Sequence, residues 1–165
     1  MTHALEYLRE EFPGEIDLPG LLAHSPAATN GIAVLHETFS LQTRLAPRTR
    51  AVLWVVAAGA IDQPAIIEAM VARAISAGLS PREVGDLLVR DVPWRDYTRD
   101  DGQQEIRALI ALVDSLVTSS NGPTPDVVES VVTTGWSIQE IIEVIVDVTS
   151  VVLMAWLVRT AEPSS

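Results

Sequence analysis

Apolar residues recur at intervals of three and four along most of the chain, a pattern that predicts amphipathic helices. The stretch from Arg50 to Ser80 is the most apolar long segment in the first half. It is expected to form two helices joined at 59–62, with a third beginning at Ser80. Further helices are expected at about 4–12, 25–45, 103–119, 125–134 and 137–159. Valine-rich runs raise the β propensity, but their spacing and flanking caps favour helix.

Small polar residues and prolines mark where the predicted helices begin. Ser25-Pro26 and Asp62-Gln63-Pro64 each place a capping side chain ahead of a proline suited to the first turn. The S-x-x-E pattern of a capping box occurs at 80–83 and again at 137–140. Helices are expected to end at three glycines, Gly59, Gly78 and Gly135.

The spacing of these elements predicts one domain. A chain of 165 residues is long enough to bury a sizeable core. Residues 1–19 are expected to form an arm or short helix, residues 20–160 a single helical domain, and residues 161–165 a tail. The fold class is therefore all-α, with about seven helices.

The composition changes the expected assembly and location. Apolar residues make up 48% of the chain, so part of the apolar surface is expected to be buried in a homo-oligomer. A net charge of −11 argues against partners such as nucleic acids and anionic membranes. The polar start shows no secretory signal, and the apolar run Val148–Val158 is short for a membrane span. A cytoplasmic protein is expected.

The absence of two residue types from the sequence removes several chemistries. There is no cysteine, which excludes thiol nucleophiles, disulfides and thiolate metal sites. All eleven basic residues are arginine, so a lysine Schiff base is excluded as well. The three histidines, His3, His24 and His36, are too far apart for a helical metal pair. No metal and no cofactor are expected.

Four short motifs occur in order between residues 20 and 160. They are LLAHSP at 21–26, LAPRTR at 45–50, AGLSPREV at 77–84, and GWS followed by EIIEV at 135–144. Their order and spacing resemble the carboxymuconolactone decarboxylase / alkylhydroperoxidase D-like superfamily. The resemblance implies that superfamily's compact orthogonal bundle around a central helical hairpin, assembled as trimers or hexamers.

The resemblance also places a redox centre in the Arg50–Ser80 stretch, but its residues are missing. Members with peroxidase activity carry a Glu, a C-x-x-C pair and a His. A gapless alignment puts these four positions on residues that can neither attack a peroxide nor move a proton: Ala51, Gln63, Ile66 and Met70. Peroxidase activity is therefore rejected.

The replaced residues suggest a pocket instead. Gln63, Ile66 and Met70 share one helical face, and Trp54 lies about one turn from the position of the missing Glu. If the superfamily fold is kept, these four side chains line a mostly apolar substrate-binding pocket for a small molecule. The alternative is that they fill the space and leave no site.

His36 is the candidate acid–base residue, because an imidazole titrates near neutral pH. It is expected on the inward face with Ile32, Leu35 and Phe39, where a purely structural role is the alternative. Two aromatic residues of the polar loop 91–102 could form a lid: Trp94 as a substrate contact, and Tyr97 as a second catalytic residue because a phenol can donate a proton. The alternative is a loop packed on its own domain or on a neighbouring subunit.

A stripe of carboxylates, Glu140, Glu143 and Asp147, is expected along the last helix. It is either a solvated face or a pair for acid–base work in a cleft.

Two functions follow. The first is a non-redox enzyme that performs decarboxylation, isomerisation, cyclisation or lactone opening on a small apolar, keto or lactone metabolite of secondary metabolism. The alternative is a catalytically silent protein of the same fold that binds a ligand or an oligomer partner. An enzyme should have a cavity of roughly 300 Å³ or more reached by a titratable side chain. A filled hairpin with a hydrogen-bonded His36 favours the silent protein.

Overall fold

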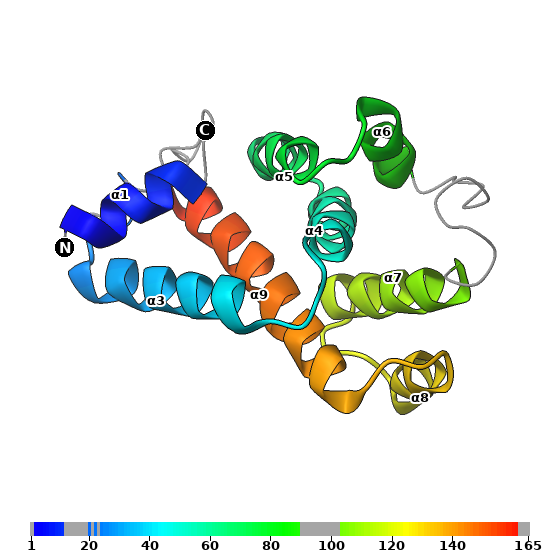
Figure 1. Ribbon diagram of the computed structural model, residues 1–165. Coiled ribbons are helices and arrows are strands. Elements are labelled where there is room, and N and C mark those ends of the chain that lie inside the picture. The colour runs from blue at the N-terminus through cyan, green and yellow to red at the C-terminus, as the bar shows by residue number, and fades with distance from the viewer. Residues whose placement is uncertain (1, 12–19, 21, 23, 90–102, 162–165) are drawn as a thin grey trace.

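A computed structural model describes residues 2–11, 20, 22, 24–89 and 103–161 (Figure 1). The described residues form eight helices and no strand, which confirms the all-α prediction. The resemblance to one particular helical superfamily stays a prediction. The helices are α1 (Thr2–Glu11), α3 (Pro26–Gln42), α4 (Pro47–Ile61), α5 (Pro64–Ser76), α6 (Pro81–Val89), α7 (Gln103–Thr118), α8 (Pro125–Thr133) and α9 (Ile138–Ala161).

Helix α4 is the centre of the fold. All nine residues from Arg50 to Ala58 are buried, so the helix is enclosed on every side over two and a half turns. It contacts α5, α6, α7 and α9, and Figure 1 shows it between α5 and α6 on one side and α7 and α9 on the other. The stretch that stands out in the sequence is therefore the core of the molecule.

Helix α9 runs diagonally through the molecule and joins its two halves (Figure 1). It contacts α4, α5, α7 and α8. Its buried positions recur every three or four residues along one face, as expected for a helix packed on one side. They are Ile141, Val144, Asp147, Val148, Val151, Met154, Ala155 and Val158.

The length and composition of α9 would also allow it to cross a membrane, over Ile138–Thr160. The sequence-based expectation considered only Val148–Val158 and took Glu143 and Asp147 as interruptions. A core helix of a soluble protein passes the same test, and 44% of the most apolar window of α9 is buried inside the protein. Its packing against four helices is the arrangement of a core helix.

Most predicted helix boundaries are confirmed. The Ser25 hydroxyl accepts a hydrogen bond from the Ala28 amide at 3.3 Å, with Pro26 in the first turn. Both capping boxes form, with reciprocal bonds between Ser80 and Glu83 and the same pairing at 137–140. Two of the glycines expected to end helices, Gly78 and Gly135, have φ angles of 94° and 108°. Such angles favour glycine after a helix.

The prediction that Gly59 ends a helix is wrong. Helix α4 continues to Ile61 and ends at Asp62, which adopts the left-handed conformation with φ of 55°. Asp62 therefore ends α4 instead of capping α5, whose N-cap is Gln63. Gly59 lies inside α4 and faces α6: a Cβ there would meet Leu88 Cδ2 at 3.4 Å, an ordinary van der Waals contact.

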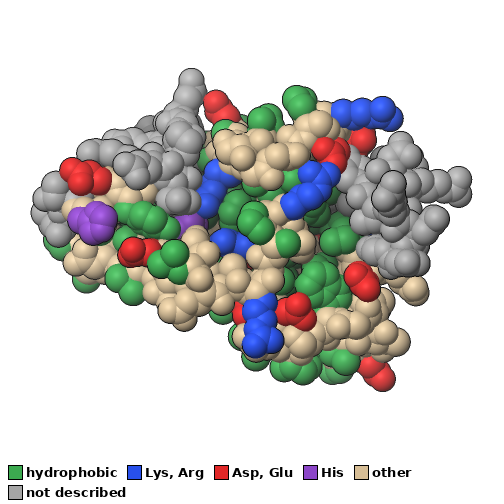
Figure 2. All heavy atoms as spheres, viewed as in Figure 1, with side chains coloured by type: hydrophobic (Ala, Val, Ile, Leu, Met, Phe, Trp, Pro, Cys, Tyr) green, Lys and Arg blue, Asp and Glu red, His purple; other side chains and the backbone are tan. Residues whose placement is uncertain are grey.

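Large apolar side chains also remain on the surface. They are spread over α3, α5, α6, α8 and α9, and Figure 2 shows apolar areas interrupted by polar and charged side chains. The predicted homo-oligomer stays a prediction. The exposed residues are Val34, Leu35, Leu41, Ile75, Val89, Val132, Ile138, Ile142 and Trp156.

Candidate functional site

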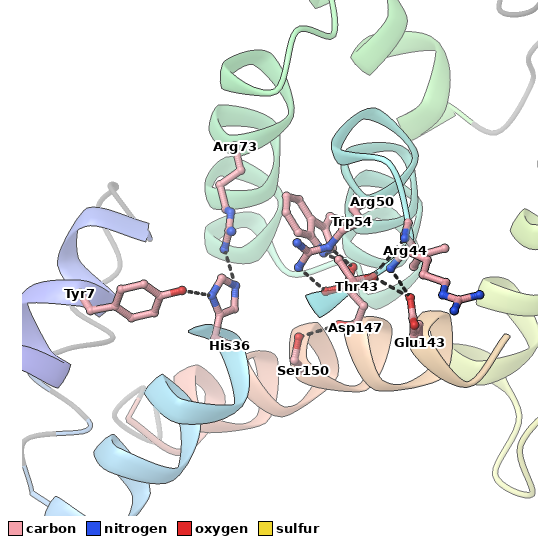
Figure 3. A network of polar contacts seen from close by, with 11 residues as sticks. Tyr7, His36, Thr43, Arg44, Arg50, Trp54, Arg73, Glu143, Asp147 and Ser150 are labelled. Carbon is pink, nitrogen blue, oxygen red and sulfur yellow. Dashed lines mark hydrogen bonds and ion pairs between the residues drawn. The ribbon is translucent and has the colours of Figure 1, made fainter. Parts of the chain in front are cut away.

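A buried ion pair connects the two central helices, α4 and α9 (Figure 3). Arg50 donates from Nε to Asp147 Oδ2 at 3.1 Å and from Nη2 to Oδ1 at 2.9 Å. The Trp54 indole donates to the same Oδ2 at 2.9 Å. The carboxylate thus accepts three hydrogen bonds, two of them in the fork geometry that suits a guanidinium. This satisfied arrangement is what allows a charge pair to lie in the core.

Two guanidinium groups lie over the Trp54 ring. The guanidinium carbons (Cζ) of Arg50 and Arg73 lie 4.8 Å and 4.3 Å from the centroid of the Trp54 ring, within the range of cation–π attraction. Figure 3 shows how this extends the polar network from α4 to α5 and onward to α3. Trp54 therefore serves as a packing platform for two charges and as a hydrogen-bond donor.

His36 lies at the other end of this network, and its hydrogen bonds define its tautomer. Arg73 Nη1 is 3.1 Å from Nε2, and the Tyr7 hydroxyl is 2.9 Å from Nδ1 (Figure 3). A guanidinium can only donate, so Nε2 accepts and Nδ1 carries the proton. Nδ1 then donates to the Tyr7 oxygen. The imidazole is neutral and both nitrogens are engaged.

Burial keeps His36 neutral over a wide pH range. Desolvation by burial, together with the positive charges of Arg73 and Arg50, lowers the pKa of His36 to about 3. The cavity beside the ring has a volume of only about 20 Å³, enough for one water molecule. A substrate therefore has little room to reach this imidazole in the observed conformation.

The inward face of α3 differs from the expected one. Thr29, Ala33 and His36 are its buried residues, whereas Leu35 is 43% exposed. The Thr29 hydroxyl donates to the carbonyl of Leu22 at 2.6 Å, which ties the start of α3 to the preceding segment. The burial of His36 was predicted, but its partners on α1 and α5 were not.

The four predicted pocket residues are brought together in the core. Trp54, Ile66 and Met70 are buried within the main hydrophobic cluster. Gln63 is only 5% exposed, and neither of its side-chain polar atoms has a hydrogen-bond partner among the described residues. Their burial corresponds to the filled alternative. Trp94 and Tyr97, the two predicted lid residues, lie outside the described residues, so their roles stay predictions.

The three carboxylates on α9 do not act as one stripe. Glu140 belongs to the capping box, and Asp147 is buried against Arg50. Glu143 accepts from the Thr43 hydroxyl at 2.8 Å and from the Arg44 amide at 2.7 Å. Burial raises the pKa of Glu143, but these hydrogen bonds outweigh it and lower the pKa overall. Each carboxylate has a structural partner.

A larger hollow lies elsewhere, where the last turns of α4 and α7 meet the outer side of α9. It is an open groove of about 580 Å³. Its floor and walls are mainly apolar, and its rim carries four hydroxyl groups. The described lining residues are Ala60, Ile61, Leu116, Val117, Thr118, Ser119, Ser120, Gly122, Thr149, Val152, Ala155, Trp156 and Arg159.

The two most distinctive residues of the groove are Trp156 and Arg159. Trp156 is 61% exposed, so its indole forms an accessible wall. Arg159 donates from Nη2 to the carbonyl of Ile61 at 3.3 Å, which holds the guanidinium beside the end of α4. It is the only charged side chain among the described residues that line the groove. Sequence reasoning missed both, although their spacing places them on one helical face.

No protein-family model, no curated protein and no solved structure matches the chain. The described residues also contain no group of three or more His, Asp or Glu side chains that could hold a metal ion. The observations that bear on function are therefore the geometries of two sites: the buried polar network and the open groove.

Proposed function

We propose that the chain is a catalytically silent ligand-binding protein, which holds a small, largely apolar molecule in the groove between α4, α7 and α9. The observation that carries this proposal is the separation of the two sites. The groove has the volume of a small-molecule site, yet its described lining offers no carboxylate and no imidazole. The best acid–base candidate, His36, lines a different and much smaller cavity.

The acid–base enzyme implied by the family resemblance has less support. It requires an imidazole that exchanges protons with a substrate near neutral pH. The pKa of His36 is lowered to about 3, and both ring nitrogens are hydrogen-bonded. A general base with so low a pKa is a weak proton acceptor. The catalytic roles of His36 and Tyr97 stay predictions. Of the two functions, the catalytically silent protein has the stronger support.

Ligand-observed NMR with a library of small apolar molecules tests the proposal. The full-length protein should bind members of the library, and Val152→Phe should abolish that binding because the larger side chain fills the partly exposed floor of the groove. His36→Gln should leave it unchanged. Binding that persists in Val152→Phe but disappears in His36→Gln would place the site at the buried network and overturn the proposal.

A further inference from the structure

We propose that the ligand of the groove is an amphipathic monocarboxylate, whose carboxylate binds Arg159 while its apolar body lies against Trp156 and the groove floor. This inference rests on the proposed ligand-binding function and adds the chemical class of the ligand. It is carried by the one cationic side chain among the described lining residues, by the exposed indole and by the volume of the groove.

The groove carries a positive charge that favours an anionic group on the ligand. The chain as a whole carries a net charge of −11. Among the described residues that line the groove, however, the charged side chain is the positive Arg159. Its bond to the Ile61 carbonyl uses one of five N–H donors and holds the group beside the groove. The remaining donors can bind a carboxylate in the planar geometry that guanidinium groups favour.

Two helices end at the groove, and their carbonyl ends oppose an anion. Ile61 is the last residue of α4, and Thr118 is the last residue of α7. The dipole effect of a helix end corresponds to about a twofold to fivefold change in affinity. A charge-assisted hydrogen bond corresponds to about tenfold to a hundredfold. Since Arg159 itself caps the end of α4, its attraction for an anion prevails.

The apolar part of the ligand follows from the other lining residues. Ile61, Leu116 and Val152 supply branched side chains, and Trp156 adds an accessible aromatic surface. A groove of about 580 Å³ accommodates a molecule of drug or metabolite size. Aromatic rings pair well with an indole, so a carboxylate with a flat or branched apolar body fits best.

The described lining supplies one cationic partner, and two of the four rim hydroxyls are not oriented to donate to a ligand. The Thr118 and Thr149 hydroxyls donate to carbonyls of their own helices, Asp114 and Ile145, each at 2.6 Å. They are therefore oriented to accept from a ligand and do not donate to a second anionic group. With one guanidinium in the described lining, a second carboxylate would lack a cationic partner.

Isothermal titration calorimetry with three matched probes tests the inference on the full-length protein. The probes are 4-phenylbutyrate, 4-phenylbutan-1-ol and 4-phenylbutylamine, which share one apolar body and differ in charge. The acid should bind with a Kd on the order of 0.1–1 mM, and the alcohol about fivefold to tenfold more weakly. The amine should not bind measurably.

Variants of the protein show where the probes bind and which side chain causes the preference for the carboxylate. Arg159→Gln should reduce the affinity for the acid to that for the alcohol and leave the alcohol unchanged. Arg82→Gln is the matched control, because Arg82 lies on α6, outside the groove lining, with its side chain 83% exposed. Arg159→Lys, which retains the charge, covers the case in which Arg159→Gln fails to fold. Val152→Phe should abolish binding of both probes.

The outcomes separate this inference from the proposed function. Equal affinities for all three probes, all lost in Val152→Phe, would keep the binding function and overturn the carboxylate class. An absence of binding by every probe and by the NMR library would overturn both. Sedimentation velocity adds a further check: a dimer that Trp156→Arg converts to monomer would show that a second copy covers the groove, and this would overturn the inference.

Discussion

Arg73 donates a hydrogen bond to Nε2 of His36 across 3.1 Å, although the two residues are 37 positions apart. The bond joins α5 to α3 and assigns the imidazole its neutral tautomer. It also explains why a histidine can lie in this core without a counter-charge. A proton on Nε2 would point at the positive guanidinium, so the imidazole stays neutral. The arrangement makes the stability of the fold depend on pH.

His36→Gln should reduce the acid sensitivity of the protein. Folded His36 has a pKa of about 3 against an ordinary 6.5, so the unfolded chain binds the extra proton. The contribution of His36 to stability is complete above pH 6.5 and declines as pH falls towards about 3, by about 1.4 kcal/mol per pH unit. A neutral glutamine removes this loss.

Urea unfolding at about pH 7, 5.5 and 4.5, followed by circular dichroism, measures this dependence. The stability difference between wild type and His36→Gln should shrink as the pH falls. His24→Gln is the control, since His24 is exposed, and it should track the wild type. Parallel pH profiles for wild type and His36→Gln would show that His36 is not buried as a neutral base.

The Arg50–Asp147 pair should show strong coupling in a double-mutant cycle. Arg50→Met leaves a buried carboxylate without its cation and should cost about 3–5 kcal/mol. The double variant with Asp147→Asn should recover at least about 2 kcal/mol, because it removes the orphaned charge and keeps an acceptor for the Trp54 indole.

Chemical denaturation of the four proteins in the cycle gives the coupling energy. Arg82→Met is the surface control; its 4.0 Å pair with Asp86 is exposed and should contribute less than about 0.5 kcal/mol. Additive effects of Arg50→Met and Asp147→Asn would contradict the bidentate geometry.

Gln63→Met should stabilise the protein. The Gln63 amide is buried with no hydrogen-bond partner in the described part of the chain, and methionine has a similar shape without the cost of an unpaired amide. We expect the free energy of unfolding to rise by about 1–2 kcal/mol. Gln104→Met, at an exposed position on α7, should change it by less than about 0.5 kcal/mol. A loss of stability in Gln63→Met would reveal a polar partner for this amide.

Gly59→Ala should also stabilise the protein, by about 0.5–1 kcal/mol, because Gly59 lies inside a helix. A methyl group there would meet Leu88 Cδ2 at 3.4 Å, an ordinary contact. Gly31→Ala in α3 has open space and should give a similar gain. Gly78→Ala should have the opposite effect, since Gly78 has a φ of 94°. Thermal unfolding of the three variants compares them directly; a destabilised Gly59→Ala would mean that α6 cannot yield.

The helices could be predicted because their signals are local. Ser25, Ser80 and Ser137 act within one turn of their own sequence position, and each was identified correctly. Gly59 shows the limit of this reasoning. A glycine can end a helix or lie inside one, and here the left-handed residue that follows α4 is Asp62, three positions later.

The sites were harder to predict because they depend on distant partners. Asp147 is 97 positions from Arg50, and nothing in the local sequence pairs them. The acidic residue within an apolar helix is a visible signal, but both interpretations of it, a solvated face and a carboxylate pair in a cleft, lacked the arginine partner on α4. The groove is formed by the ends of α4 and α7 and one side of α9, so Trp156 and Arg159 line a common site only because α9 crosses the other two helices.

The Arg50–Asp147 pair also decides which surroundings α9 can occupy. This helix is long and apolar enough to lie in lipid, and Asp147 would then sit near the middle of the bilayer. There the carboxylate would cost about 2.5–3.5 kcal/mol. Inside the bundle the same carboxylate has three hydrogen-bond donors. One charged side chain thus favours docking on α4 over insertion in a membrane, and its loss would weaken the bundle while removing one of the costs of insertion.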